Sequence, residues 1–264
     1  MIELLAGLLP PGLTAWAALV IMLCAGIGAF ITAAFGLGGG VLLLGVMAAF
    51  MPVTAVIPVH GVVQLGANGW RMVLLHRAVR WPVLAAFAAG GVLGAAAGAR
   101  VLVRLPGAWI ELALGVFILW TCWGPRPELR RGSLARVGVG GAITSLLTLF
   151  VGATGPFVSA FLRALGLDRR AHVGTFSACM SLQHALKLVV FGLAGFAFGP
   201  WLPWLAVTFA CVMIGTWLGR QVLERLDERR FRLILGLILT VLALRLVYSA
   251  LTAPGMPLAG LAWA

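Results

Sequence analysis

Charged side chains are scarce in this chain: they make up 10% of the 264 residues and include one lysine and only seven acids. In a water-soluble domain about a quarter of the residues are charged and about half are apolar, whereas this chain is 62% hydrophobic. The apolar residues form long unbroken runs instead of short alternating segments, which excludes a β-barrel. The composition predicts an all-α polytopic membrane protein.

Catalytic and metal-binding patterns are also missing. The sequence has no HExxH motif, no Ser/His/Asp arrangement and no close pair of carboxylates within an apolar run. The four cysteines all lie in apolar stretches without metal-ligand spacing, so we interpret them as packing thiols that form no disulfide. The chain is therefore predicted not to be an enzyme and to use no cofactor and no metal. Its net charge of +12 comes from basic groups between apolar runs, so nucleic acid is not expected as a partner.

Six apolar runs have about the 20 residues that a helix needs to cross a bilayer. They lie at 53–75, 82–104, 107–123, 172–197, 203–224 and 231–251. Two further segments, 14–50 and 137–165, are apolar runs that a cluster of glycines cuts in two. Unwound backbone inside a bilayer must line a cavity or be buried in protein, and paired breaks in two halves point to a transporter's substrate site.

Most of the 19 basic residues form four clusters between these runs. The clusters are Arg71, Arg77 and Arg80; Arg126, Arg130, Arg131 and Arg136; Arg163, Arg169 and Arg170; and Arg220, Arg225, Arg229, Arg230 and Arg232. The positive-inside rule places all four in the cytoplasm, which requires that 14–50 and 137–165 each enter and leave by one face. Both broken segments are therefore predicted to be hairpins of two half-helices, in a multi-pass protein of the cytoplasmic (inner) membrane whose termini lie outside.

The two halves of the chain can be aligned on glycines and one glutamine. The aligned pairs are Gly36–Gly152 at a shift of 116 residues, Gln64–Gln183 at 119, and Gly94–Gly215 and Gly98–Gly219 at 121. The predicted architecture is two inverted repeats, at 14–123 and 137–251, each a Gly-broken hairpin plus three transmembrane helices. A cytoplasmic basic linker at 124–136 joins them.

Polar residues are few within the apolar runs. His60, Gln64 and Asn68 are four residues apart and share one helix face. Gln183 stands at the matching place in the second half. An amide offers two donors and an acceptor, which suits an oxyanion, so we interpret both glutamines as substrate-binding. The alternative is that they hydrogen-bond neighbouring helices together.

Each glycine cluster is expected to place helix N-termini near the bilayer midplane, where free N–H groups and the positive end of the helix dipole attract anions. Close helix packing through small residues is the alternative. The predicted substrate-binding residues are Gly38, Gly39, Gly40, His60, Gln64, Asn68, Thr154, Gly155, Gln183 and Lys187.

Three ionisable residues within the runs need an explanation. Lys187, the only lysine, is costly inside a bilayer and is predicted to face the substrate, with snorkelling to an interface as the alternative. Glu111 is expected to pair with Arg245 or with Arg104. His60 titrates near neutral pH and is a candidate for a coupling proton, although a lone histidine is more often simply hydrogen-bonded.

The first half carries a family pattern. It consists of the break from Gly36 to Gly40 followed by Pro52, Thr54, His60, Gln64 and Asn68. This pattern resembles the sulfite exporter TauE/SafE family over residues 14–250, and the resemblance implies a transporter of sulfur-containing anions such as sulfite and organosulfonates. The second half departs from it at Cys179 and Lys187, which leaves the particular anion open.

The expected partners are a small anionic substrate and the lipid bilayer. A passive anion channel and, with less support, an intramembrane enzyme are the alternative functions. The sequence makes no prediction about oligomeric state or the direction of transport.

Overall fold

The computed structural model describes residues 9–10, 12–35, 38–102, 107–124, 132–222 and 228–253, and this part of the chain is helical without strands. The α-helices are α2 (Ala15–Phe35), α3 (Gly39–Phe50), α4 (Val53–Leu74), α5 (Trp81–Leu102), α6 (Gly107–Trp123), α7 (Leu134–Val151), α8 (Gly155–Arg163), α9 (Arg169–Leu193), α10 (Leu202–Val222) and α11 (Glu228–Thr252). Two 3₁₀ turns, η1 (His76–Ala78) and η2 (Gly199–Trp201), precede α5 and α10. The predicted all-α class is confirmed, and each of the six predicted spans is a single helix.

Both Gly-broken segments fold back on themselves. In the first, a Cβ placed on Gly12 would lie 3.5 Å from Cγ of Pro52, so the two ends of the segment meet. In the second, the Gly132 N–H donates to the Ala164 carbonyl oxygen at 2.9 Å. The second break follows from Gly152, whose φ of +75° ends α7 in a conformation that favours glycine.

The arms of these hairpins differ in length, which corrects the prediction of two half-helices. The first arms, α2 and α7, have 21 and 18 residues and are long and apolar enough to cross a membrane alone. The second arms, α3 and α8, have only 12 and 9 residues. Three other helices, α5, α9 and α10, also meet the length and composition of a membrane span among the described residues.

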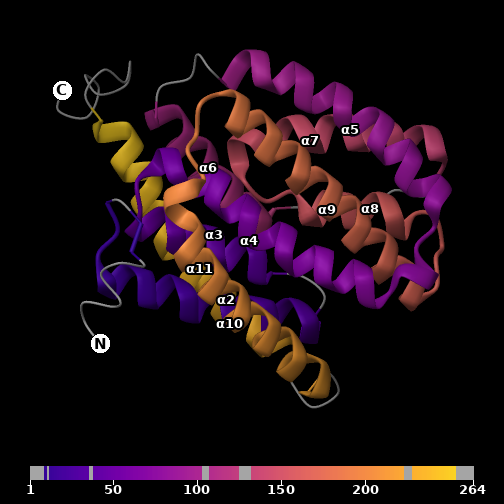
Figure 1. The fold of residues 1–264 in the computed structure, drawn as a ribbon, viewed down its shortest axis with the longest axis horizontal. Helices are drawn as coiled ribbons and strands as arrows, with labels where there is room; N and C mark the ends of the chain where they lie inside the picture. The colour runs from indigo at the N-terminus through magenta and orange to yellow at the C-terminus, as the bar shows by residue number, and fades with distance from the viewer. Residues whose placement is uncertain are drawn as a thin grey trace.

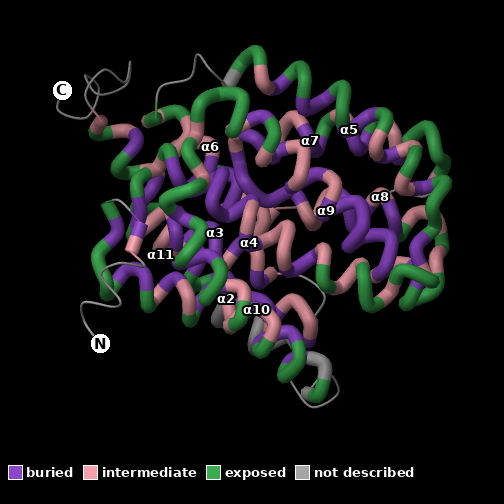
Figure 2. Tube along the Cα trace, in the orientation of Figure 1, coloured by how far each residue is buried: buried purple, intermediate pink, exposed green. Residues whose placement is uncertain are grey.

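The molecule has polar groups inside and apolar side chains outside. Leu93 on α5, Trp217 on α10 and Val241 on α11 are 70%, 63% and 69% exposed, whereas Gln183 and Lys187 are 0% and 1% exposed. Figure 2 shows buried residues concentrated in the middle of the bundle and exposed residues along its outer helices. Exposed apolar side chains along the outer helices suit a surface that lies in lipid.

Helices α4 and α9 cross in the centre of the bundle, and α5 with α7 and α2 with α10 form close pairs on either side of them (Figure 1). Helix α4 contacts α10 and α7, and α9 contacts α5 and α7, so the packing of α4 on α9 joins the two outer pairs.

Glycines make the two outer pairs possible, and they do so in matching ways. A Cβ on Gly94 would strike the α7 backbone at Ala142, and one on Gly98 would lie 2.7 Å from the Leu149 side chain and 3.5 Å from the Leu146 backbone. The same atom on Gly215 or Gly219 would strike the α2 backbone, at residues 26 and 30. Gly94 and Gly98 on α5 are the residues that align with Gly215 and Gly219 on α10 at a shift of 121. The α2 and α7 residues that these glycines meet are related by a shift of 116. Two inverted copies predict this reciprocity, and the repeat itself stays a prediction.

The expected pair between Glu111 and Arg245 is wrong. Arg245 donates from Nη1 to the Ala49 carbonyl oxygen at 2.9 Å, and within the described residues no ion pair joins it to Glu111. Three other predictions concern residues outside the described part of the chain: Arg104, most of the 124–136 linker, and the two termini. The predicted outside location of the termini therefore stays a prediction.

Candidate functional site

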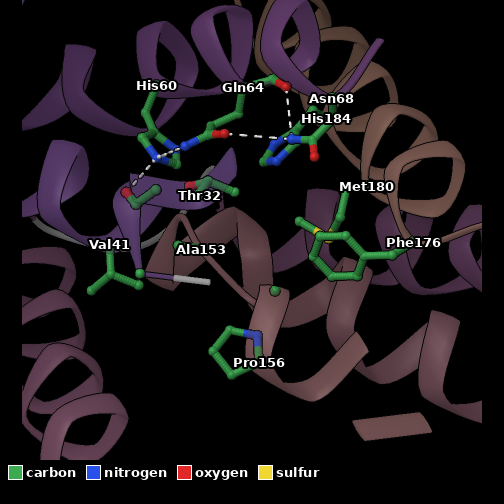
Figure 3. A pocket seen from close by; sticks show the side chains of 13 residues that line it. Thr32, Val41, His60, Gln64, Asn68, Ala153, Pro156, Phe176, Met180 and His184 are labelled. Carbon is green, nitrogen blue, oxygen red and sulfur yellow. Dashed lines mark hydrogen bonds between the residues drawn. The ribbon is translucent and has the colours of Figure 1, made fainter. Parts of the chain in front are cut away.

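A cavity lies where the two hairpin breaks meet α4 and α9. Its lining consists of Thr32, Gly38, Gly40, Val41, His60, Gln64, Asn68, Ala153, Gly155, Pro156, Phe176, Met180 and His184. Figure 3 shows the polar side chains of α4 on one side of this space, with Pro156, Phe176 and Met180 on the other. No acidic side chain is among the described residues that line it, so the cavity is suited to a neutral or anionic ligand.

The α4 side of the cavity is a ladder of hydrogen bonds. Nε2 of His60 lies 2.9 Å from the Gly40 carbonyl oxygen, at the start of α3. One turn further along α4, Gln64 accepts from Nδ2 of Asn68 at its backbone oxygen (2.9 Å) and at Oε1 (3.4 Å). Arg71 then donates to Oδ1 of Asn68 at 3.3 Å. The ladder fixes the orientation of the Gln64 side chain.

The Gln64 amide keeps an N–H group for a ligand. Because a carbonyl oxygen can only accept, the proton of His60 is on the Nε2 that faces Gly40. That nitrogen then cannot accept from Nε2 of Gln64, which lies 3.4 Å away. The Gln64 amide nitrogen therefore has donor capacity that the protein does not use.

The α9 side of the cavity has different chemistry. Helices α4 and α9 begin at Val53 and Arg169, so equivalent positions on them are 116 residues apart. At that spacing the counterparts of His60, Gln64 and Asn68 are the three lining residues of α9, namely Phe176, Met180 and His184. The two helices thus present equivalent faces to the cavity, one polar and the other mostly apolar.

The match of Gln64 with Gln183, made at 119 residues, therefore does not hold. Gln183 lies one residue before His184 on α9, is 0% exposed and does not line the cavity. Its Oε1 accepts from Thr154 at 2.7 Å, and its Nε2 donates to Thr144 at 3.0 Å and to Ser145 at 3.4 Å. These bonds occupy the amide, so Gln183 joins α9 to α7 and to the start of α8, which was the alternative role considered for it.

Lys187 also lies outside the cavity lining. Its Nζ donates to the Gly152 carbonyl oxygen at 2.6 Å, which places a positive charge at the C-terminal end of α7. The Lys187 stem reaches α4, since a Cβ on Gly61 would lie 3.0 Å from its Cδ. The described residues provide no carboxylate partner for this ammonium.

Two helices begin at the cavity. α3 starts after Gly38, whose φ of +108° favours glycine and whose missing side chain leaves the first N–H groups of the helix without a cap. α8 starts after Thr154, and Pro156 in its first turn has no N–H to satisfy. Both positive dipole ends are therefore directed towards one space.

Six of the ten predicted site residues line the cavity: Gly38, Gly40, His60, Gln64, Asn68 and Gly155. The other four, Gly39, Thr154, Gln183 and Lys187, do not. Sequence reasoning missed the α9 lining of Phe176, Met180 and His184, although their spacing of four residues was visible. Each of His60 and His184 has a buried Nδ1 without a hydrogen-bond partner among the described residues, and their ring centroids are 6.1 Å apart.

We expect the Lys187→Met variant to bind anions within about threefold of the parent affinity, a change of less than about 1 kcal/mol. The ammonium is outside the cavity lining, and the Gly152 carbonyl oxygen keeps a donor in the Thr148 hydroxyl at 3.2 Å. Calorimetry with methanesulfonate on purified protein measures the affinity. A tenfold or larger loss would mean that Lys187 contacts the anion after all.

A helical membrane bundle with a central cavity between two hairpin breaks is the architecture of a membrane transporter. The family model of the sulfite exporter TauE/SafE family matches residues 20–246, and the chain belongs to that family. It is also similar to the probable inner membrane transporter protein TsaS of Comamonas testosteroni, with 26% identity over 158 residues. That alignment covers 56% of this chain and 66% of TsaS, just under two thirds of its length. No solved structure matches the chain.

Proposed function

We propose that this protein is a secondary transporter that moves a small sulfur-containing oxyanion across the cytoplasmic membrane, and that the anion binds in the central cavity. The observation that carries the proposal is that two helix N-termini meet the unused donor of Gln64 in a space whose described lining residues include no acidic side chain. Helix N-termini and amide donors bind sulfur and phosphorus oxyanions without needing a charged side chain.

The unequal sides of the cavity, one polar and one mostly apolar, favour an organosulfonate over sulfite. The oxyanion fits the side formed by His60, Gln64 and the start of α3, while an organic substituent fits the side formed by Phe176 and Met180. Sulfite has no apolar part and would leave that second side in contact with polar oxygen, which costs binding energy.

In this proposal, movement of two inverted repeats relative to each other drives the transport cycle. The matching glycine contacts of α5 with α7 and of α2 with α10 support two inverted copies, 14–123 and 137–251, around the central site. Rocking of one copy against the other would expose the cavity to each face of the membrane in turn. A proton remains the proposed coupling ion, and His60, whose Nδ1 has no hydrogen-bond partner among the described residues, remains the candidate residue for it.

Flux into proteoliposomes tests the function. We expect saturable uptake of methanesulfonate and ethanesulfonate, slower uptake of sulfite, and faster uptake when unlabelled sulfonate is trapped inside. A carrier shows this acceleration because its loaded site returns faster than its empty site. Flux that rises in proportion to concentration without acceleration would establish a channel instead, and absence of flux for all three anions would refute the proposal.

A further inference from the structure

A second, narrower cavity adjoins the first. The two share Thr32 and Gln64 as lining residues. The second cavity is lined by α2, α3, α4 and α10 and reaches Arg71 in the last turn of α4. Arg71 is the one charged residue among the described residues that line either cavity.

Small residues keep this second space open. Gly28 and Ala29 of α2 and Ala67 of α4 form its walls near Gln64. A Cβ on Gly28 would lie 2.7 Å from the Gly39 carbonyl oxygen, so the position accepts no side chain while α2 and α3 pack as they do. The sequence therefore leaves a narrow gap between Gln64 and Arg71 along α4.

The equivalent place in the second half is filled. At the spacing of 116 residues, the counterparts of Gly28, Ala29 and Ala67 are Thr144, Ser145 and Gln183. These three side chains are 1%, 1% and 0% exposed and are hydrogen-bonded to one another through the Gln183 amide. The counterpart of Arg71 is Lys187, so each half has one cation at the equivalent position. Arg71 faces a gap, whereas Lys187 lies behind a cluster of polar side chains.

Arg71 has unused capacity to bind an anion. Its only hydrogen bond among the described residues runs from Nη1 to Oδ1 of Asn68, at 3.3 Å. A guanidinium offers five N–H groups in a planar fork that matches two oxygens of a sulfonate or carboxylate. The link through Asn68 also connects Arg71 to Gln64, the donor in the central cavity.

We propose that the second cavity is the part of the anion's path that leads from the central cavity to the cytoplasm, and that Arg71 is an anion-binding residue at its cytoplasmic end. In the second half of the chain, the Thr144–Ser145–Gln183 cluster fills the equivalent space in front of Lys187 and closes the path on that side. This rests on the proposed transport function. The cytoplasmic end follows from the basic cluster of Arg71, Arg77 and Arg80, which the positive-inside rule places on that side.

A matched pair of cysteines tests which half is open. Ala29→Cys and Ser145→Cys add a thiol of similar size at equivalent positions, one beside the gap and one in the cluster. With a membrane-impermeant, sulfonate-bearing methanethiosulfonate, we expect Ala29→Cys to react at least about tenfold faster than Ser145→Cys, because the reagent's negative charge suits an anion path. The parent, whose cysteines are buried or half-buried, gives the background.

Sidedness is part of the same experiment. Ala29→Cys should react in inside-out vesicles and not in right-side-out ones, with exposed Arg77→Cys as the control for the inner face and exposed Pro52→Cys for the outer face. Equal rates at positions 29 and 145, or reaction at position 29 from the outer face alone, would overturn the proposal.

Two substitutions test the path by flux. Ala67→Gln copies the residue that stands at this place in the second half, and Arg71→Gln removes the charge. We expect both to lower methanesulfonate flux at least about tenfold. Ala67→Gln should keep methanesulfonate affinity within about threefold, whereas Arg71→Gln should weaken binding as well, and Arg71→Lys should retain part of the flux. Parent-like flux in both Gln variants would overturn the proposal. If the parent transports no sulfonate, the proposed function fails, whereas the cysteine pair still decides which half is open.

Discussion

Replacing Gln64 with alanine is expected to weaken methanesulfonate binding by about ten- to a hundredfold, whereas the same change at Gln183 leaves affinity within about threefold. Gln64 keeps an amide donor that faces the cavity, and losing a hydrogen bond to a charged ligand costs roughly 1.5–3 kcal/mol. Gln183 instead uses its amide on Thr144, Ser145 and Thr154.

The effects on stability should be the opposite: Gln183→Ala is expected to destabilise the protein more than Gln64→Ala does. Gln183→Ala leaves buried hydroxyls without their partner and is expected to lower stability by about 1–3 kcal/mol. Gln64 is half-buried beside an open space, so its removal costs less. Calorimetric titration gives the affinities, and thermal unfolding in detergent gives the stabilities. Equal loss of affinity in both variants would restore the view that the two glutamines bind the anion together.

The second large effect concerns helix packing. Gly94→Ala and Gly215→Ala are each expected to lower stability by about 1–3 kcal/mol, since the added methyl would strike the backbone of the partner helix at Ala142 or Gly26. Gly199→Ala is the control, because nothing lies within 4 Å of a Cβ at that position. Its stability should remain close to that of the parent.

The readout is the apparent Tm in detergent, where a loss of 1 kcal/mol corresponds to about 2–4 °C in a protein of this general size. Similar decreases for Gly94→Ala and Gly215→Ala would support the inverted repeat, because the repeat makes the two positions equivalent. A Gly215→Ala protein as stable as Gly199→Ala would contradict the close packing of α2 on α10.

The spans and the hairpins could be predicted from the sequence because they depend on local properties. Apolar runs identify helices, and the basic clusters around Arg71 and Arg130 require an even count of crossings. The lengths of the hairpin arms followed less well, since a glycine cluster marks where a helix breaks and not how far the preceding arm extends. α2 and α7 proved long enough to span alone.

The candidate site could be predicted on α4 and not on α9. His60, Gln64 and Asn68 are polar in an apolar run, so their face was evident. On α9, polar residues lie on two neighbouring faces, and the face with Gln183 gave the better match to Gln64. Which face points to the cavity depends on the rotation of the helix about its axis, and the partners of Gln183 on α7 and α8 set that rotation.

The unequal faces of α4 and α9 also determine how a cargo molecule would be held during a transport cycle. A sulfonate whose oxygens lie against Gln64 has its organic end against Phe176 and Met180, and turning it around would place charge on apolar carbon. The bound sulfonate would therefore keep one orientation while the protein changes conformation around it. It would enter with one end first and leave with the other end last. Cargo length, more than charge, would then set the upper limit of what this protein carries.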